Sequence, residues 1–378
     1  MYRSIVALCA LLGLAAGPCF ADIPIPSPPN IDATAYILVD YHTGKVLAAK
    51  NAMDELPMAS LTKLMTTYIV FEELASGKLK LDEPVTISEH AWRQGGSRTF
   101  VQVGTQVPVR SLILGMVVQS GNDATVALAE RIAGTEDAFV QMMNATAQRL
   151  GLTHTHYVDA TGLPQPGHYT TARDLSLLTA ALIRDFPQYY HYFSVKQFEY
   201  NHIMQQNRNG LLNTDPGVDG LKTGHTDAAG YCLVASQHRH GMRLISVVLG
   251  GQTFTGRESS SAALLNYGFS FYDTKLVAKA RAPLANATVW KAQNPAVPVG
   301  IDHDLYVTIP RDDDNALRTS VQIAPRLMGP LTPQSTIGQL VVTDRGKTIA
   351  TAPLHPLVAD GAGTWWRDLV DTVRLWLS

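Results

Sequence analysis

The segment Pro57-Met-Ala-Ser-Leu-Thr-Lys-Leu-Met-Thr66 opens the helical middle of the chain and carries the first of three short strings that organise it. No residue after Pro57 breaks a helix, and proline suits the first turn of one. Residues three apart share a helix face, so the hydroxyl of Ser60 and the amine of Lys63 can meet. Serine attacks well only when a base takes its proton, and lysine is a base only when burial or a nearby cation lowers its pKa. The segment therefore predicts a nucleophile and its base near a helix start.

The second string, Ser120-Gly121-Asn122, begins 60 positions after Ser60 and lies between two expected helical stretches, 112–119 and 124–132. We expect Gly121 to permit a sharp turn that points the side chains of Ser120 and Asn122 the same way. Ser120 can then pass a proton to a leaving amine. Asn122 can hydrogen-bond a substrate amide or hold Lys63. An ordinary turn between two helices is the alternative interpretation.

The third string, Lys222-Thr223-Gly224, begins 102 positions after Ser120, in a strand expected at 218–225. A strand edge can pair with an extended peptide, and Gly224 allows its backbone to approach closely. Lys222 and Thr223 offer a charge and a hydroxyl to a carboxylate, and Lys222 can be the cation that lowers the pKa of Lys63. Roughly one S-x-x-K but only on the order of 0.1 K-T-G is expected by chance in such a chain. The order and spacing of all three strings together, and not any single string, therefore indicate the function.

The pattern around these strings predicts the fold of the first three quarters of the chain. Residues 35–50 are typical of a hairpin with its turn at 41–44, and further strands are expected at 218–224, 231–237 and 242–250. Helical spacing dominates 57–190 and returns at 262–272. Strands from both ends thus enclose a helical middle. This predicts an α/β (α+β) domain with one antiparallel sheet, helices on its faces, a helical subdomain and a cleft between them.

Two further modules are expected after residue 275. Proline-punctuated β runs at 305–309, 320–323, 337–342 and 348–350 predict a small all-β domain. Residues 365–378 predict an amphipathic helix with three tryptophans, Trp365, Trp366 and Trp376. Its length of roughly 21 Å is too short for a membrane core of about 30 Å, so it can lie in the interface. A helix docked on the protein or a dimer contact is the alternative.

The remaining composition excludes several classes of protein. A net charge of −2 argues against a nucleic-acid binder. Residues 1–21, with Arg3 and an apolar run, are typical of a secretory signal peptide, whose removal leaves Cys232 as the one cysteine, expected to be a buried apolar residue. The close histidine pairs, 154 with 156 and 238 with 240, do not form an H-E-x-x-H motif, so we expect no metal and no other cofactor.

The expected domains are 1–21 signal peptide, 22–275 catalytic domain, 276–360 β domain and 361–378 membrane-anchor helix.

With segments 57–66, 119–124, 207–211, 219–226 and 256–258, the chain resembles the D-alanyl-D-alanine carboxypeptidases of the penicillin-binding protein 5 type, low-molecular-mass penicillin-binding proteins. The resemblance covers essentially the whole mature chain. It implies a serine β-lactamase/penicillin-binding transpeptidase-like fold. It also implies a periplasmic enzyme, held on the inner-membrane surface by its C-terminal helix, that removes the terminal D-alanine of peptidoglycan stem pentapeptides and so regulates crosslinking and cell shape.

The resemblance further implies roles for individual residues. Ser60 attacks the penultimate D-Ala carbonyl, Lys63 is the general base, and Ser120 with Lys222 protonates the leaving D-alanine before water hydrolyses the acyl-enzyme. The backbone N–H groups of Ser60 and His225 form the oxyanion hole. Thr223 and an arginine hold the terminal carboxylate, and the choice between Arg208 and Arg257 stays open. The site residues implied for substrate binding are Asn122, Lys222, Thr223, Gly224, His225, Arg208 and Arg257. β-Lactam antibiotics are expected to acylate Ser60 and to be hydrolysed slowly.

Three other functions compete with this one. A D,D-endopeptidase shares the chemistry and is the nearest alternative. A class A β-lactamase shares the motif order, but no glutamate lies between Glu136 and Glu199, and the 155–172 loop offers only Asp159 as a carboxylate for deacylation. A non-catalytic cell-wall-binding module is disfavoured because no member of the catalytic set is missing.

Overall fold

The computed structural model describes residues 25–311, 313 and 316–377, so the expected signal peptide lies outside the described residues and stays a prediction. The chain divides into two compact units. One holds residues Ser27–Ala282 and Asp302–Asp312, and the other holds Pro283–Ile301 and Asp313–Ser378 together with the chain up to Pro26. The expected domain boundaries at 275 and 360 stay a prediction.

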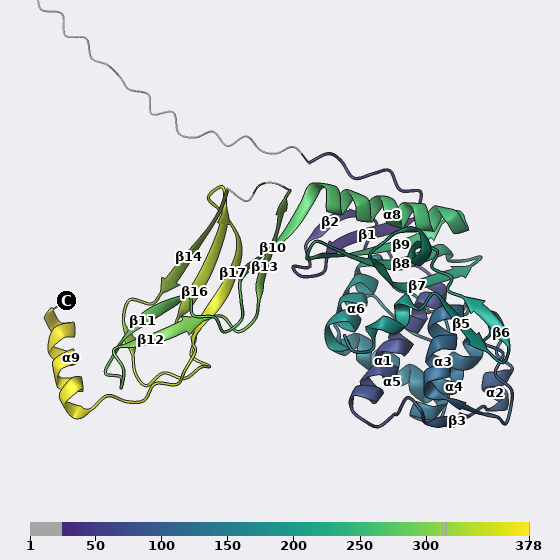
Figure 1. Ribbon diagram of the computed structural model, residues 1–378, viewed down its shortest axis with the longest axis horizontal. Helices are drawn as coiled ribbons and strands as arrows, with labels where there is room; N and C mark the ends of the chain where they lie inside the picture. The colour runs from purple at the N-terminus through teal and green to yellow at the C-terminus, as the bar shows by residue number, and fades with distance from the viewer. Residues whose placement is uncertain (1–24, 312, 314–315, 378) are drawn as a thin grey trace, which may run out of the picture. The chain divides into compact units, whose positions relative to one another are not determined.

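The first unit is built on a five-stranded antiparallel sheet assembled from both ends of its sequence (Figure 1). Its strands, in spatial order, are β2 (Val46–Lys50), β1 (Ala35–Asp40), β9 (Met242–Gly251), β8 (Gly230–Arg239) and β7 (Val218–Thr226). The hairpin of β1 and β2 adds to the sheet through β1, which pairs with β9 along its whole length. The expected antiparallel sheet is confirmed, and β7 forms one of its edges.

Helices cover both faces of this sheet, as Figure 1 shows. The helix α8 (Phe254–Phe271) packs on β8 and β9 from one side, and α6 (Ala172–Asp185) packs on β1 and β9 from the other. The helix α8 begins eight residues before the expected start at 262, because the hydroxyl of Thr253 caps it by accepting from the N–H of Gly256 at 2.9 Å. An early start brings Arg257 onto its first turn.

The helical subdomain follows the expected middle of the chain, and threonines begin two of its helices. Thr135 and Thr171 accept hydrogen bonds from the N–H groups of Ala138 and Asp174, which satisfies donors that the helix leaves open. The helices are η1 (Ala59–Thr62), α1 (Lys63–Ala75), α2 (Glu89–Trp92), α3 (Val109–Leu114), η2 (Gly115–Gln119), α4 (Asn122–Ala133), α5 (Glu136–Arg149), η3 (Tyr190–Ser194) and α7 (Leu211–Thr214). Two small antiparallel strand pairs complete it, β3 (Pro84–Thr86) with β4 (Gln106–Pro108), and β5 (Gln197–Tyr200) with β6 (Ile203–Gln206).

The second unit contains the expected small β domain and the expected C-terminal helix. A six-stranded sheet has the order β14 (Leu317–Ile323), β16 (Gly338–Asp344), β17 (Lys347–Pro356), β12 (Ala296–Gly300), β11 (Ala285–Trp290) and β15 (Leu327–Met328). The helix α9 spans Trp365–Leu377. One more ladder, of β10 (Tyr272–Ala278) with β13 (Leu305–Pro310), falls within the first unit, where the Thr308 hydroxyl donates to Asp40.

Candidate active site

One cavity of about 630 Å³ in the first unit brings the three strings together. Ser60 comes from η1, Ser120 from the turn before α4, and Thr223 from the edge strand β7. The cavity is lined by Ser60, Gly96, Ser97, Ser120, Gln206, Asn207, Arg208, Thr223, Gly224, His225, Tyr231, Phe254 and Arg257. The other three expected site residues, Lys63, Asn122 and Lys222, are each at most 4% exposed, so only the tips of their side chains can act in the cavity.

Ser60 and Lys63 meet as expected, although the local helix differs from the expected one. Ser60 lies in the 3₁₀ turn η1, and Lys63 is the first residue of α1. A 3₁₀ turn has three residues per turn, so residues three apart eclipse each other. The amine of Lys63 accordingly lies 3.1 Å from the hydroxyl oxygen of Ser60, and it donates to the carbonyl of Thr161 at 2.6 Å. The pair is thus preassembled.

Burial makes Lys63 a suitable base. Desolvation is the largest cause that lowers its pKa, to about 7, and the charge of Arg208 adds to the effect while Asp159 and Asp123 oppose it. The sequence interpretation named Lys222 as the neighbouring cation. Lys222 itself has a pKa well below the ordinary lysine value, first through burial and then through the charges of Lys63, Arg208 and Arg257. Near neutral pH a substantial fraction of Lys63 is therefore unprotonated and can accept a proton from Ser60.

The second string forms the expected turn between η2 and α4, but a different residue makes it. Ser120, not Gly121, adopts the left-handed conformation (φ 67°, ψ 30°). Gly121 is needed for space, because a Cβ there would lie 2.0 Å from the hydroxyl oxygen of Thr99. The hydroxyl of Ser120 is buried without a hydrogen-bond partner among the described residues. It is therefore free to receive or pass a proton at the cavity.

Asn122 uses one end of its amide and leaves the other open. Its Nδ2 donates to the carbonyl of Gly95 at 2.7 Å, and its Oδ1 is buried without a partner in the described part of the chain. The hydrogen bonds of the Lys63 amine run instead to Ser60 and Thr161. The open Oδ1 fits the first of its two expected roles, acceptance of a hydrogen bond from a substrate amide.

The third string lies on β7, whose outer edge has no neighbouring strand in the described sheet. A Cβ on Gly224 would come within 3.0 Å of the carbonyl of Met58 and 3.3 Å of the backbone nitrogen of Ser60. The backbone of β7 therefore runs directly beside the nucleophile turn, and a side chain at position 224 would be tightly crowded there. The amine of Lys222 donates to the carbonyl of Thr223 at 2.9 Å, and both residues are buried.

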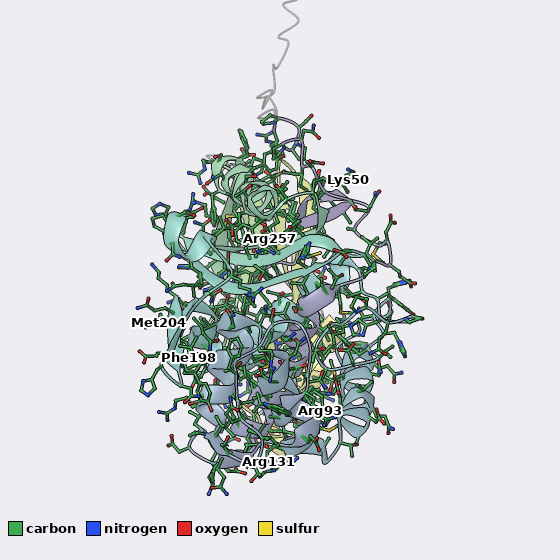
Figure 2. The ribbon with its side chains drawn as sticks, turned by 90° about the vertical axis from the view of Figure 1, so that its right-hand side faces the viewer. Lys50, Arg93, Arg131, Phe198, Met204 and Arg257 are labelled. Carbon is green, nitrogen blue, oxygen red and sulfur yellow. The ribbon has the colours of Figure 1, made fainter. Side chains whose placement is uncertain are left out.

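The two candidate arginines differ in their surroundings. Arg257, labelled in Figure 2, is 3% exposed, and its guanidinium donates to the carbonyls of Gly224 at 3.2 Å and Arg208 at 3.4 Å. It also lies over the rings of Tyr231 and Phe254. Arg208 is exposed, and both arginines line the cavity. Arg257 is thus held against two backbone carbonyls, whereas the side chain of Arg208 is exposed.

Sequence reasoning missed the structural roles of two carboxylates, Asp123 and Asp159. Asp123 accepts from the N–H groups of Thr99, Phe100, Val101 and Ala124 at 2.7–3.2 Å, which fastens segment 99–101 to the start of α4. Its position directly after the second string was the available indication. Asp159 accepts three hydrogen bonds through Oδ1 from Thr161 and Gly162. A carboxylate so engaged within its own loop is poorly placed to serve as a deacylating base.

The burial of Cys232 agrees with the sequence interpretation. Cys232 is fully buried, and burial raises the pKa of its thiol to about 11, so it is unreactive. Among the described residues there is no group of three or more His, Cys, Asp or Glu side chains that could hold a metal ion. His156, His238 and His240 are exposed, as expected for surface or turn residues.

Comparison with known proteins gives a consistent result. Residues 23–253 match the family model described as D-alanyl-D-alanine carboxypeptidase, and residues 272–362 match that of the penicillin-binding protein 5 C-terminal domain. The chain is 44% identical to the D-alanyl-D-alanine carboxypeptidase DacA of Escherichia coli K12, over 93% of this chain and 89% of that protein. It is similar to the crystal structure of penicillin binding protein 5 from Haemophilus influenzae (TM-score 0.85, 41% identity, 89% of this chain and 99% of that one). It is also similar to penicillin-binding protein D2 from Listeria monocytogenes in its ampicillin-bound form (TM-score 0.59, 33% identity, 64% of this chain and 100% of that one).

Proposed function

The chain belongs to the D-alanyl-D-alanine carboxypeptidases of the penicillin-binding protein 5 type and is a serine D-Ala-D-Ala carboxypeptidase, and we propose that Ser60 is its nucleophile and Lys63 its general base. The observation that carries this assignment is the contact of the two side chains at 3.1 Å, with the pKa of the lysine lowered to about 7. Neutral Lys63 takes the proton of Ser60 as the oxygen attacks the penultimate D-Ala carbonyl. The carbonyl of Thr161 fixes the amine during the transfer.

The developing oxyanion is stabilised by backbone N–H groups of Ser60 and His225. The support for this role is the close approach of β7 to η1, where Gly224 lies against the backbone of Met58 and Ser60. Preorganised donors of this kind, aimed at the position of the developing charge, are commonly the largest single contribution to such catalysis. An extended peptide paired with the open edge of β7 delivers its carbonyl to this point.

Departure of D-alanine requires a proton, which we assign to Ser120 with Lys222. The Ser120 hydroxyl is buried at the cavity and has no partner among the described residues, so it can accept the proton from Lys63 and give it to the leaving nitrogen. Asn122 receives the substrate amide through its open Oδ1. Water then attacks the acyl-enzyme. Ser120→Ala is expected to slow the reaction by about 10²–10⁴-fold, the usual contribution of a positioned acid or base.

The terminal carboxylate of the substrate is held by Thr223 and Arg208. Thr223 lines the cavity beside Arg208, which is exposed there, while Arg257 donates to the backbone carbonyls of Gly224 and Arg208. Arg257 thereby positions the strand and the neighbouring arginine. The substrate that fits is a peptidoglycan stem pentapeptide ending in D-Ala-D-Ala.

β-Lactams acylate the same serine. The Listeria relative was crystallised in an ampicillin-bound form. Deacylation is slow in our proposal because no free carboxylate stands opposite the acyl bond in the 155–172 loop, where Asp159 is engaged by Thr161 and Gly162. The class A β-lactamase alternative is disfavoured for the same reason.

Location at the periplasmic face of the inner membrane is supported by the apolar face of α9. Asp371 on its polar face accepts from the backbone N–H of Lys291 at 2.7 Å, and Arg367 donates to the carbonyl of Gln293 at 3.2 Å. The opposite face exposes seven apolar side chains, Trp365, Trp366, Leu369, Val370, Val373, Trp376 and Leu377, at 44–87%. No helix among the described residues is both long and apolar enough to cross a membrane. We propose that α9 lies in the interface with its tryptophans at headgroup level.

The function is tested by incubating the purified protein with a peptide that ends in D-Ala-D-Ala and measuring released D-alanine. Ser60→Ala is the control, and the intact mass after benzylpenicillin treatment should show an adduct only with Ser60 present. No release by the wild type, or equal release by both proteins, contradicts the assignment. A crosslinked D,D-dimer as a second substrate measures the endopeptidase alternative, and fast benzylpenicillin turnover would point to a β-lactamase.

A further inference from the structure

The turn that carries the nucleophile has an unfavourable backbone and needs outside support. Ala59, the residue before Ser60, has a positive φ of 48°. The left-handed region is unfavourable for a non-glycine residue, and such residues persist where surrounding contacts hold them. Ala59 is 3% exposed, and its carbonyl accepts from the hydroxyl of Thr62 at 2.8 Å. The position of Ser60 therefore depends on how firmly Thr62 is held.

A buried histidine fixes the hydroxyl of Thr62. The oxygen of Thr62 lies 2.7 Å from Nε2 of His168, and the backbone N–H of Val158 donates to Nδ1 of the same ring at 3.1 Å. Since Nδ1 accepts, a neutral ring carries its proton on Nε2 and donates it to Thr62. Thr62 must then direct its own proton to Ala59. His168 is 7% exposed, and burial lowers its pKa, which keeps the ring neutral although Asp159 opposes the shift.

The loop that carries His168 also touches the turn and the base directly. Gly162 has φ +92°, and a Cβ there would lie 1.9 Å from the carbonyl of Ala59. The next residue towards the N-terminus, Thr161, accepts from Lys63 at 2.6 Å. Asp159 holds both through its Oδ1. One loop therefore contacts the nucleophile turn at two points and the base at a third.

We propose that His168 is a positioning residue for the carboxypeptidase reaction, acting through Thr62 and the carbonyl of Ala59 to hold Ser60 in line with Lys63. The role belongs to the Nε2–H donor of His168 and does not include proton transfer to the substrate. This inference rests on the proposed role of Ser60 as the nucleophile. It predicts that loss of the Nε2–H donor slows acylation, because the hydroxyl oxygen of Ser60 is no longer held in its attack position. Binding of the peptide should be unaffected.

The test compares pairs of variants in the full chain. His168→Leu and Thr62→Val remove the hydrogen bond and keep most of the volume. His168→Gln and Thr62→Ser keep a donor and a hydroxyl at the same places. His156→Leu is the matched control, because His156 is an exposed histidine of the same loop. Acylation by a fluorescent penicillin, deacylation of the adduct, and KM and kcat with a D-Ala-D-Ala peptide are measured for each, normalised to the fraction of protein that labels at saturation.

We expect His168→Leu and Thr62→Val to slow acylation and lower kcat by about 10–100-fold at unchanged KM, the range that small misplacements of reacting groups produce. His168→Gln, Thr62→Ser and His156→Leu should remain near the wild type. The Leu/Val double variant should lose no more than either single variant, because the two act in series. The pH at which acylation rises should stay that of Lys63 throughout.

Three results overturn the proposal. Wild-type acylation in His168→Leu shows that the contact is not needed, and equal loss in His168→Gln and His168→Leu shows that the donor is not the relevant property. A displaced pH inflection in His168→Gln shows that the ring itself titrates in the reaction. Labelling of Ser60→Ala by the fluorescent penicillin would instead contradict the assignment of the nucleophile, so the two failures are distinguishable.

Discussion

The side-chain amine of Lys63 donates a 2.6 Å hydrogen bond to the backbone carbonyl of Thr161, which lies 98 residues further along the chain. The same amine is 3.1 Å from the hydroxyl of Ser60, which lies three residues earlier in the chain. The base is therefore aimed by a distant loop, although nucleophile and base come from one short helical segment. A change in the loop that contains Thr161 can therefore displace the amine of Lys63 from Ser60, even when the S-x-x-K string itself is unchanged.

Acylation should depend on the ionisation of Lys63. Since burial lowers the pKa of Lys63 to about 7, its neutral form increases up to that pH and dominates above it. The second-order rate constant with a fluorescent penicillin should rise about tenfold per pH unit below pH 7 and become level above it. Lys63→Arg should be inactive at every pH, because a guanidinium keeps its proton. A flat profile in the wild type would contradict the role of Lys63 as base.

The same shift predicts a pH dependence of stability. The unfolded chain has an ordinary lysine with a pKa near 10.4, so between about pH 7 and 10 it binds a proton that folded Lys63 has given up. The free energy of unfolding of the wild type should therefore rise with pH in this window, relative to Lys63→Met, by up to about 1.4 kcal/mol per unit. Urea denaturation at several pH values measures this difference. If the free energy of unfolding changes with pH in the same way in both proteins, the pKa of Lys63 is that of an ordinary lysine.

Gly121→Ala should damage both the fold and the site. A Cβ at Gly121 would lie 2.0 Å from the Thr99 hydroxyl oxygen and 2.8 Å from the Thr99 nitrogen, which cannot move far because Asp123 holds it. Overpacking of this kind costs about 1–3 kcal/mol. Gly95→Ala is the matched control, since a Cβ there meets nothing within 4 Å. Thermal unfolding and penicillin labelling of both variants measure the effect, and equal behaviour would refute the steric explanation.

Arg208→Gln and Arg257→Gln should give different kinetic defects. Loss of a charged hydrogen bond to the substrate carboxylate should raise KM in Arg208→Gln by about tenfold or more, with a smaller effect on a peptide whose C-terminus is amidated. Arg257→Gln should lower kcat for both peptides and the thermal stability, because its guanidinium supports Gly224 and Arg208 from a buried position. The reverse pattern would assign carboxylate binding to Arg257.

The helix α9 should attach the protein to lipid. Truncation after Gly363, or Trp366→Ala with Trp376→Ala, should remove binding to vesicles of phosphatidylethanolamine and phosphatidylglycerol and leave D-alanine release unchanged. Arg374→Gln serves as the control, since Arg374 is exposed on the same helix but is not apolar. Sedimentation with vesicles measures binding. Unchanged binding after truncation would leave α9 without the proposed role.

The sequence predicted those features that depend on short-range patterns. The turn residues at 41–44 predicted the hairpin of β1 and β2. The spacing of three gave the contact of Ser60 with Lys63, because a helical turn fixes it locally. The order and spacing of the three strings, together with the segments around them and the modules after residue 275, led to the predicted family. Each of these properties is encoded within a few residues of where it acts.

The tertiary structure decided what holds the site. Burial lowers the pKa of Lys63, and burial is a sum over the whole fold that no local pattern contains. At the second string Ser120 adopts the left-handed conformation, and Thr99 leaves no room for a side chain at Gly121. Asp123, Asp159 and His168 act through partners brought together from separate segments. The sequence by itself determined which groups we propose to react, and only the packing of distant segments determined their orientation and their pKa values.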